Sequence, residues 1–89
     1  MDIRRVVGKN VQRYRIEAEL SQKEFATGMG VEQGYVGRLE AGERNPTIVT
    51  IWHVAEALGV RPAALFRARD QSSKATAKRQ KARKPIIQI

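Results

Sequence analysis

A break at Gly28-Met29-Gly30 separates two short stretches of helical apolar spacing, and it constrains the fold more than any other feature of the chain. Ser21, followed three residues later by Glu24, predicts a capping box at the start of the first stretch. Because glycine accepts the left-handed backbone that ends helices, the glycines on either side of Met29 should end this helix. The next helix is then expected from about Glu32 to Ala41, so the sequence predicts two short helices joined by a tight turn.

Apolar residues spaced by three and four positions predict three further helices. The first should cover about residues 3–18, the fourth should begin near Thr47 and end at Gly59, and Pro62 suits the first turn of a fifth. We therefore expect an all-α, compact five-helix domain over residues 1–66. The expected inward residues are Ile3, Val7, Val11, Tyr14 and Ala18, then Phe25, Ala26 and Met29, then Val36 and Leu39, then Ile48, Ile51, Ala55 and Leu58, while the fifth helix carries Ala63, Leu65 and Phe66.

The net charge of +8 is divided unevenly along the 89 residues. Residues 67–89 hold eight Lys and Arg against Asp70 alone, a net +7, so residues 1–66 carry nine basic and eight acidic residues, a net +1. The basic character therefore belongs to a polar C-terminal tail, residues 67–89, and an argument for DNA binding from charge alone would apply only to that tail. The case for the domain has to come from its motif.

Composition argues against several classes of protein. The chain has no Cys and a single histidine, His53, so a His or Cys metal cluster and a Ser-His-Asp triad are not expected. No paired carboxylates or nucleophile–base set appears, which disfavours an enzyme, and no cofactor is expected. No apolar run approaches the ~18 residues of a membrane helix. A cytoplasmic, nucleoid-associated protein without a membrane partner is the expectation.

The residues around the predicted turn match a known family at fixed spacing without a gap. The matching residues are Leu20-Ser21-Gln22, Phe25-Ala26, Gly30-Val31, Tyr35-Val36, Leu39-Glu40, Gly42, Pro46 and Ala55-Glu56-Ala57-Leu58-Gly59-Val60. With these residues, the chain over about residues 5–66 resembles the lambda-repressor-like family, the Cro and phage-repressor type also called the XRE family. The resemblance implies a five-helix domain with a helix-turn-helix that binds operator DNA, commonly as a dimer.

The resemblance implies a role for each matching position. The third helix would lie in the major groove, where Gln can pair with the adenine edge and Arg with the guanine edge. Glu32 departs from the Ser or Thr that the family favours at that cap, and two glycines leave places in the groove without a side chain. The implied base contacts are Gln33, Gly34, Gly37 and Arg38, the implied phosphate contacts are Gln22, Tyr35 and Arg44, and the implied structural ion pair is Arg15 with Glu40.

The tail lies outside the resemblance and has three interpretations. Its cations could form a DNA arm, the segment could be a solvated extension, or Pro85–Ile89 could contact a protein partner or stabilise a dimer. The candidate arm residues are Lys78, Arg79, Lys81, Arg83 and Lys84.

Taken together, these features predict a sequence-specific DNA-binding transcriptional regulator, a repressor or autoregulator, that acts on double-stranded DNA as a homodimer. The dimer surface is expected on the fourth and fifth helices, near Trp52 and Phe66, although Trp52 could instead lie at the edge of the core. The alternative is an interaction module, such as an antitoxin-type protein, in which binding to another protein is primary and DNA binding is secondary. The operator sequence, the sign of regulation and the biological system do not follow from the sequence.

Overall fold

A computed structural model describes residues 2–68, and within them every regular element is helical. The candidate DNA arm, Lys78 to Lys84, and Pro85–Ile89 lie outside the described residues. The elements are α1 (Ile3–Glu17), α2 (Gln22–Met29), α3 (Gln33–Glu40), α4 (Ile48–Leu58) and the 3₁₀ helix η1 (Pro62–Phe66).

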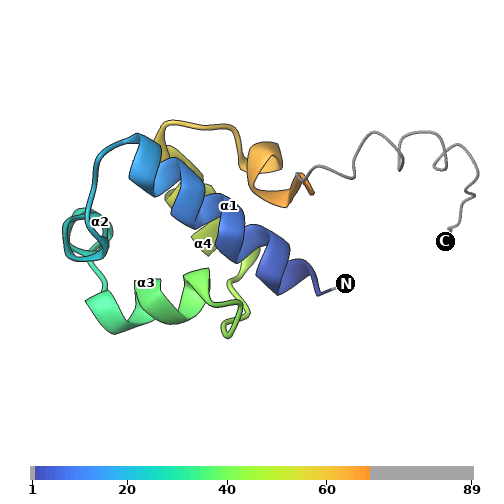
Figure 1. The fold of residues 1–89 in the computed structure, drawn as a ribbon, viewed down its shortest axis with the longest axis horizontal. Coiled ribbons are helices and arrows are strands. Elements are labelled where there is room, and N and C mark those ends of the chain that lie inside the picture. The colour runs from blue at the N-terminus through green and yellow to red at the C-terminus, as the bar shows by residue number, and fades with distance from the viewer. Residues whose placement is uncertain (1, 69–89) are drawn as a thin grey trace, which may run out of the picture.

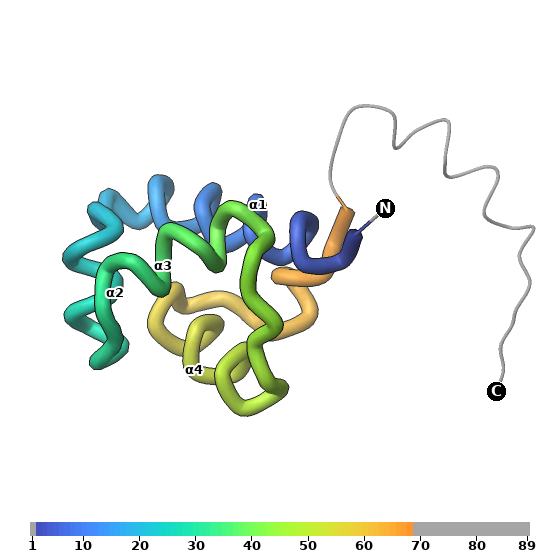
Figure 2. Tube along the Cα trace, turned by 90° about the horizontal axis from the view of Figure 1, so that it is seen from below, coloured from blue at the N-terminus to red at the C-terminus, as the bar shows by residue number. Residues whose placement is uncertain are grey.

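Helix α1 is the central element of the domain. Helices α3 and α4 and the short η1 all pack against it, whereas α2 packs against α3 and α4 (Figure 1). In Figure 2 the chain passes from α1 through α2 to α3, and α3 returns alongside α1. This arrangement holds α2 and α3 together at one side of the molecule.

Local capping explains where the helices begin and end. Thr47 caps α4 by accepting a hydrogen bond from the Thr50 backbone N–H at 3.0 Å. Gly30 and Gly59 end α2 and α4 with φ of +75° and +72°, in the left-handed region that glycine adopts without strain. Gly28, by contrast, lies inside α2 and does not end it, because the turn needs only one left-handed residue.

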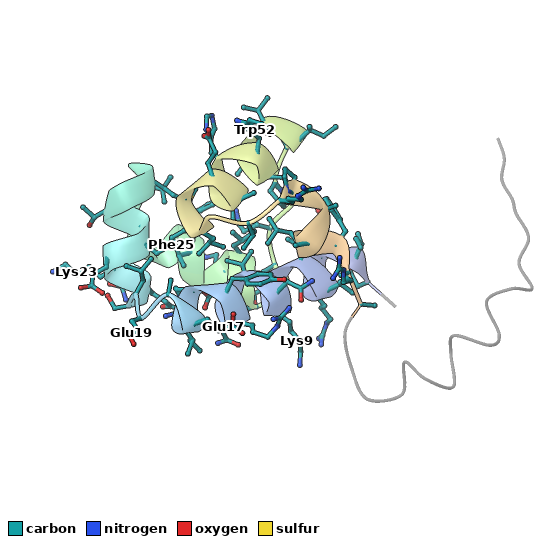
Figure 3. The ribbon with its side chains drawn as sticks, turned by 90° about the horizontal axis from the view of Figure 1, so that it is seen from above. Lys9, Glu17, Glu19, Lys23, Phe25 and Trp52 are labelled. Carbon is teal, nitrogen blue, oxygen red and sulfur yellow. The ribbon has the colours of Figure 1, made fainter. Side chains whose placement is uncertain are left out.

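The core draws on every element. Phe25 points from α2 into the interior, whereas Lys23 on the same helix points away from it (Figure 3). Val54 is fully buried, although the predicted stripe of α4 did not include it. The buried apolar residues are Val7, Val11, Phe25, Ala26, Val36, Leu39, Ile51, Val54, Ala55 and Leu65.

Two expectations about the fold were wrong in part. The expected fifth helix is a five-residue 3₁₀ turn, so the described domain has four α-helices and one short η1. Leu65 anchors η1 in the core, while Phe66 is 47% exposed. Ile3 and Ile48, both expected to face inward, are 50% and 85% exposed, because each is the first residue of its helix and projects past the end of the core.

The exposed first residues of α1 and α4 lie on a common surface. Ile3, Ile48 and Phe66 line one open groove of about 250 Å³, together with Pro46 at its edge. Trp52, one turn along α4, is 53% exposed and stands on the outer side of the helix (Figure 3). We call Ile3, Ile48, Val49, Trp52 and Phe66 the apolar surface.

Candidate nucleic-acid interface

Hydrogen bonds fix both ends of α2. The Glu24 backbone N–H donates to Ser21 Oγ at 2.9 Å, and the Ser21 N–H donates to Glu24 Oε1 at 2.8 Å, which completes the capping box. After the left-handed Gly30, the Val31 N–H donates to the Ala26 carbonyl at 3.0 Å. The start of α2 and its exit toward α3 are both fixed by these bonds, so the two helices are held as one unit.

Helix α3 has a buried side and a solvent side. Val36 and Leu39 are buried in the core, whereas Gln33, Gly34 and Arg38 are exposed. The fourth predicted base-contacting position, Gly37, is half-buried on the same outward side. This follows from helical geometry, because residues separated by three or four positions share a face.

Each of the two glycines on the outward side of α3 has a side chain close to it, one from α3 itself and one from α2. A Cβ built at Gly34 would lie 3.7 Å from Arg38 Nη1, so the Arg38 guanidinium folds back over Gly34. A Cβ built at Gly37 would lie 3.7 Å from Gln22 Oε1 and 3.9 Å from Gln22 Nε2. The amide of Gln22, at the start of α2, therefore lies over α3 at the position of Gly37.

An ion pair joins α1 to the end of α3. Arg15 Nε donates to Glu40 Oε2 at 2.6 Å and Arg15 Nη2 donates to Glu40 Oε1 at 3.2 Å, with both residues only 9% exposed. Arg15 Nη1 also donates to the Leu20 carbonyl at 2.8 Å. Gln22 Nε2 reaches the same carboxylate, donating to Glu40 Oε1 at 2.9 Å.

Two of the predicted phosphate-contacting residues contact each other. The Arg44 guanidinium lies over the Tyr35 ring, with 4.9 Å from its central carbon to the ring centroid. Tyr35 is half-buried in α3, and Arg44 is exposed in the following loop. A cation held over an aromatic face keeps its charge and its free N–H groups available at the surface.

Glu32 begins α3 without a side-chain cap. Its carboxylate makes no cap hydrogen bond to the first turn, and the residue is exposed. The first N–H groups of α3 therefore have no capping side chain.

Reasoning from the sequence missed three contacts in the domain. One is the contact of Gln22 with Glu40 and Gly37, and another is Asn10, which is 4% exposed and donates from Nδ2 to the Leu65 carbonyl at 2.8 Å and the Arg67 carbonyl at 2.9 Å. The third is Gly8, where a Cβ would lie 2.5 Å from the Leu39 carbonyl oxygen. Only Gly8 left a signal, since a glycine inside a helical pattern indicates close packing.

Comparison with known proteins agrees with this geometry. The sequence profile of the HTH_3 family, described as helix-turn-helix, matches residues 11–65. The chain belongs to the HTH_3 family. Its members include DNA-binding transcriptional regulators of the helix-turn-helix type, so the chain is a DNA-binding regulator of this XRE-like class.

Three similar proteins illustrate the family. The HTH-type transcriptional regulator y4dJ of Sinorhizobium fredii, itself uncharacterised, is 47% identical over 60 residues, which cover 67% of this chain and 78% of that protein. Control protein C.SmaI of Serratia marcescens is 40% identical over 58 residues, covering 65% of this chain and 69% of its own length. The crystal structure of the restriction-modification controller protein C.AhdI from Aeromonas hydrophila is 35% identical, with a TM-score of 0.67, and the match covers 71% of this chain and 96% of that one.

Within residues 2–68 no helix is both long and apolar enough to cross a membrane.

Proposed function

We propose that this chain is a sequence-specific transcriptional regulator that binds operator DNA as a homodimer, with α3 of each copy in the major groove. The observation that carries the proposal is the outward side of α3, where Gln33 and Arg38 are exposed while Val36 and Leu39 hold the helix to the core. A B-DNA major groove is ~12 Å wide and admits one α-helix.

Base discrimination would come from Gln33 and Arg38. An Arg guanidinium can donate two hydrogen bonds to guanine, and a Gln amide can pair with the adenine edge, each worth ~1–3 kcal/mol of discrimination. Arg38 folds back over Gly34, so its guanidinium lies along the surface of α3 and covers the position where Gly34 has no side chain. Gly34 and Gly37 supply no side chain of their own, so the Arg38 and Gln22 side chains that lie over them would face the bases at these positions.

Phosphate contacts would set the register of α3 on the duplex. Arg44 with Tyr35 supplies a cation and a hydroxyl beside α3, and Gln22 lies in the first turn of α2, where backbone N–H groups suit an anion.

The tail cations would add further contacts, each steepening the salt dependence by ~0.9 in log–log slope. Replacing all five with Gln should therefore flatten that slope by up to ~4.5; an unchanged slope would refute the arm. These cations are Lys78, Arg79, Lys81, Arg83 and Lys84.

Dimerisation would occur through the apolar surface. An exposed apolar groove on a domain surface indicates an interface, and Ile48, which lines this one, is 85% exposed. Two copies would then present their α3 helices about one helical turn, ~34 Å, apart on one face of the DNA. Sedimentation should show a dimer for the wild type and a monomer for Ile48→Asp, while His53→Asp, a change at another exposed α4 residue, should remain dimeric. A wild-type monomer at micromolar concentration would contradict the paired arrangement.

The regulated gene is proposed to be the chain's own. Similarity to C.SmaI and to the restriction-modification controller C.AhdI supports a controller role, in which the dimer binds the promoter of its own gene and represses it as its concentration rises. A mobility-shift assay on the DNA upstream of the gene tests this directly.

Selection of bound sequences from a random DNA pool tests sequence-specific binding. The wild type should enrich a two-fold symmetric site, and Arg38→Ala or Gln33→Ala should weaken binding to it by about 5- to 150-fold. Arg61→Ala is the matched control, because it removes the same charge from an exposed residue outside α2 and α3. Unchanged affinity in both α3 variants would refute direct readout.

A second candidate is an interaction module that docks a different protein. The same apolar surface favours it, together with the near-neutral charge of residues 1–66. Failure of the wild type to enrich any DNA sequence, combined with a monomeric state, would favour this candidate over the regulator.

A further inference from the structure

We propose that the Gln22 side chain, although it belongs to α2, reads a base at the position where α3 has Gly37. The inference rests on the proposed function and deepens it, by assigning a specificity-determining group to a place that α3 leaves without a side chain. The group it recognises is the exocyclic amino group of adenine or cytosine in the major groove.

The Gln22 amide lies on the side of α3 that is proposed to face DNA. Gln22 Oε1 and Nε2 lie 3.7 Å and 3.9 Å from where a Cβ of Gly37 would stand, so the amide rests on the outward side of α3. Gly37 shares that side with Gln33, Gly34 and Arg38. A single methyl group at Gly37 would fit at these distances, but a longer side chain in the same direction would meet the amide.

The hydrogen bond to Glu40 fixes which way the Gln22 amide is turned. A carboxylate only accepts hydrogen bonds, so the amide must turn its NH₂ toward Glu40, and Gln22 Nε2 donates to Glu40 Oε1 at 2.9 Å. The carbonyl oxygen, Oε1, then has to point elsewhere. Among residues 2–68 no donor hydrogen-bonds to Oε1, so it is free to accept one from outside the domain.

The Gln22 amide is held in place by a series of hydrogen bonds that continues through Glu40 to Arg15. Glu40 is held by two hydrogen bonds from Arg15, and Arg15 is held in turn by the Leu20 carbonyl. Both charged residues are 9% exposed, so the chain of bonds that orients Gln22 is largely shielded from water. A preorganised polar group loses little conformational entropy when it binds.

The unpartnered Oε1 of Gln22 determines which chemical group the side chain can bind. An oxygen that accepts suits a base amino group, and adenine N6 and cytosine N4 are the amino groups that the major groove displays. An anionic phosphate offers no hydrogen to Oε1. The backbone N–H groups at the start of α2 remain available to a phosphate, so the two parts of Gln22 would have separate roles.

The experiment compares the wild type with Gln22→Ala on the selected operator and on every single-base-pair variant of it. Gln22→Ala should lose discrimination at one base pair, by about 5- to 150-fold, and keep the wild-type preferences at the others. Its log–log salt slope should be unchanged, because a neutral side chain neutralises no phosphate. Gln12→Ala, which removes an exposed glutamine from α1, is the matched control and should bind as the wild type does.

Two further measurements keep the test independent of folding. Gly37→Met, which should displace the amide, ought to erase the preference at the same base pair with Gln22 still present. The second measurement uses an operator whose adenine or cytosine at that base pair lacks its amino group. The affinity of the wild type for this operator should fall by the same factor, and the affinity of Gln22→Ala should not fall any further.

Three outcomes would overturn this inference and leave the proposed function standing. In the first, Gln22→Ala binds all sequences more weakly by the same factor. In the second, Gly37→Met changes the preference at a different base pair, and in the third, the missing amino group lowers the affinity of both proteins equally. If the wild type enriches no sequence, the proposed function fails and the inference fails with it.

Discussion

Arg15 on α1 donates to both carboxylate oxygens of Glu40 at the end of α3, at 2.6 and 3.2 Å, inside a domain where both side chains are almost fully covered. The pair ties the central helix to the helix that is proposed to enter DNA. Each buried charge is stabilised by the other, because an unpaired charge in a medium of low polarity would have lost its hydration without gaining a partner.

Removing one member of this pair should therefore cost much more than removing both. We expect Arg15→Met or Glu40→Leu alone to lower the free energy of unfolding by about 3–5 kcal/mol, a large share of the ~5–15 kcal/mol typical of a small domain. The double variant should recover most of that loss, because no unpaired charge remains. Urea unfolding followed by circular dichroism measures all three. A double variant as unstable as the sum of the singles would show that the pair is not energetically coupled.

Gly8 is expected to reject even a methyl group. A Cβ there would lie 2.5 Å from the Leu39 carbonyl oxygen and 2.6 Å from that of Glu40, and backbone atoms cannot rotate away. Gly8→Ala should thus destabilise the domain by about 1–3 kcal/mol through overpacking. The matched change Gly28→Ala, in α2 with nothing within 4 Å, should instead stabilise it by ~0.5–1 kcal/mol. Thermal unfolding of the two variants should move in opposite directions; a stabilised Gly8→Ala would contradict the close crossing of α1 and α3.

Asn10 should be needed to hold η1 against α1. Its Nδ2 donates to the Leu65 and Arg67 carbonyls, so Asn10→Ala leaves two acceptors without a donor and should cost ~1–3 kcal/mol. In Asn10→Asp one carboxylate oxygen would face the same two carbonyl oxygens at 2.8 and 2.9 Å, while Arg13 lies farther from the other, at 3.4 Å. The closer, buried carbonyls raise the pKa of that carboxyl in the folded state. The folded variant then binds a proton more tightly than the unfolded chain does. Its stability relative to the wild type should therefore improve as the pH falls, and a deficit that grows in acid would contradict this arrangement.

Asp2 is expected to stabilise α1 in a pH-dependent way. Hydrogen bonds from the Arg4 side chain and backbone N–H lower the pKa of Asp2 from 3.8 to about 2. Because the folded-state pKa lies below the unfolded one, the stabilisation is complete above pH 3.8 and is lost as the pH falls toward 2. Asp2→Asn keeps a capping oxygen but not the titration. The difference in unfolding free energy between wild type and variant should shrink across that window, and a constant difference would refute the role of the charge.

Much of the secondary structure could be predicted because its signals are local. The capping box of Ser21 and Glu24, the cap at Thr47 and the left-handed Gly30 and Gly59 each depend on residues within a few positions of one another. The boundary residues of α3, Glu32 and Ala41, were likewise readable from the pattern. The outward positions of α3 followed from its period once its buried side was known.

Other features depended on neighbours that are remote in the sequence. Glu40 lies 25 residues from Arg15, a pairing that only the family resemblance implied, and 18 from Gln22. Asn10 reaches a carbonyl 55 residues away. Spacing within one helix carries no information on such contacts. The exposure of Ile3 and Ile48 was missed for the same reason, since an apolar residue at a helix end belongs to the core only if another element extends far enough to cover it.

The amino-acid sequence by itself determined the helical class, the turn between α2 and α3 and the family pattern, because capping and periodicity act over one or two helical turns. Only the tertiary structure decided that α1 crosses α3 at Gly8, that Arg15 and Gln22 share the Glu40 carboxylate, and that a side chain of α2 covers a glycine of α3. The physical reason is that packing brings together atoms whose chain separation is long, and the geometry of each such meeting is set by all the helices at once.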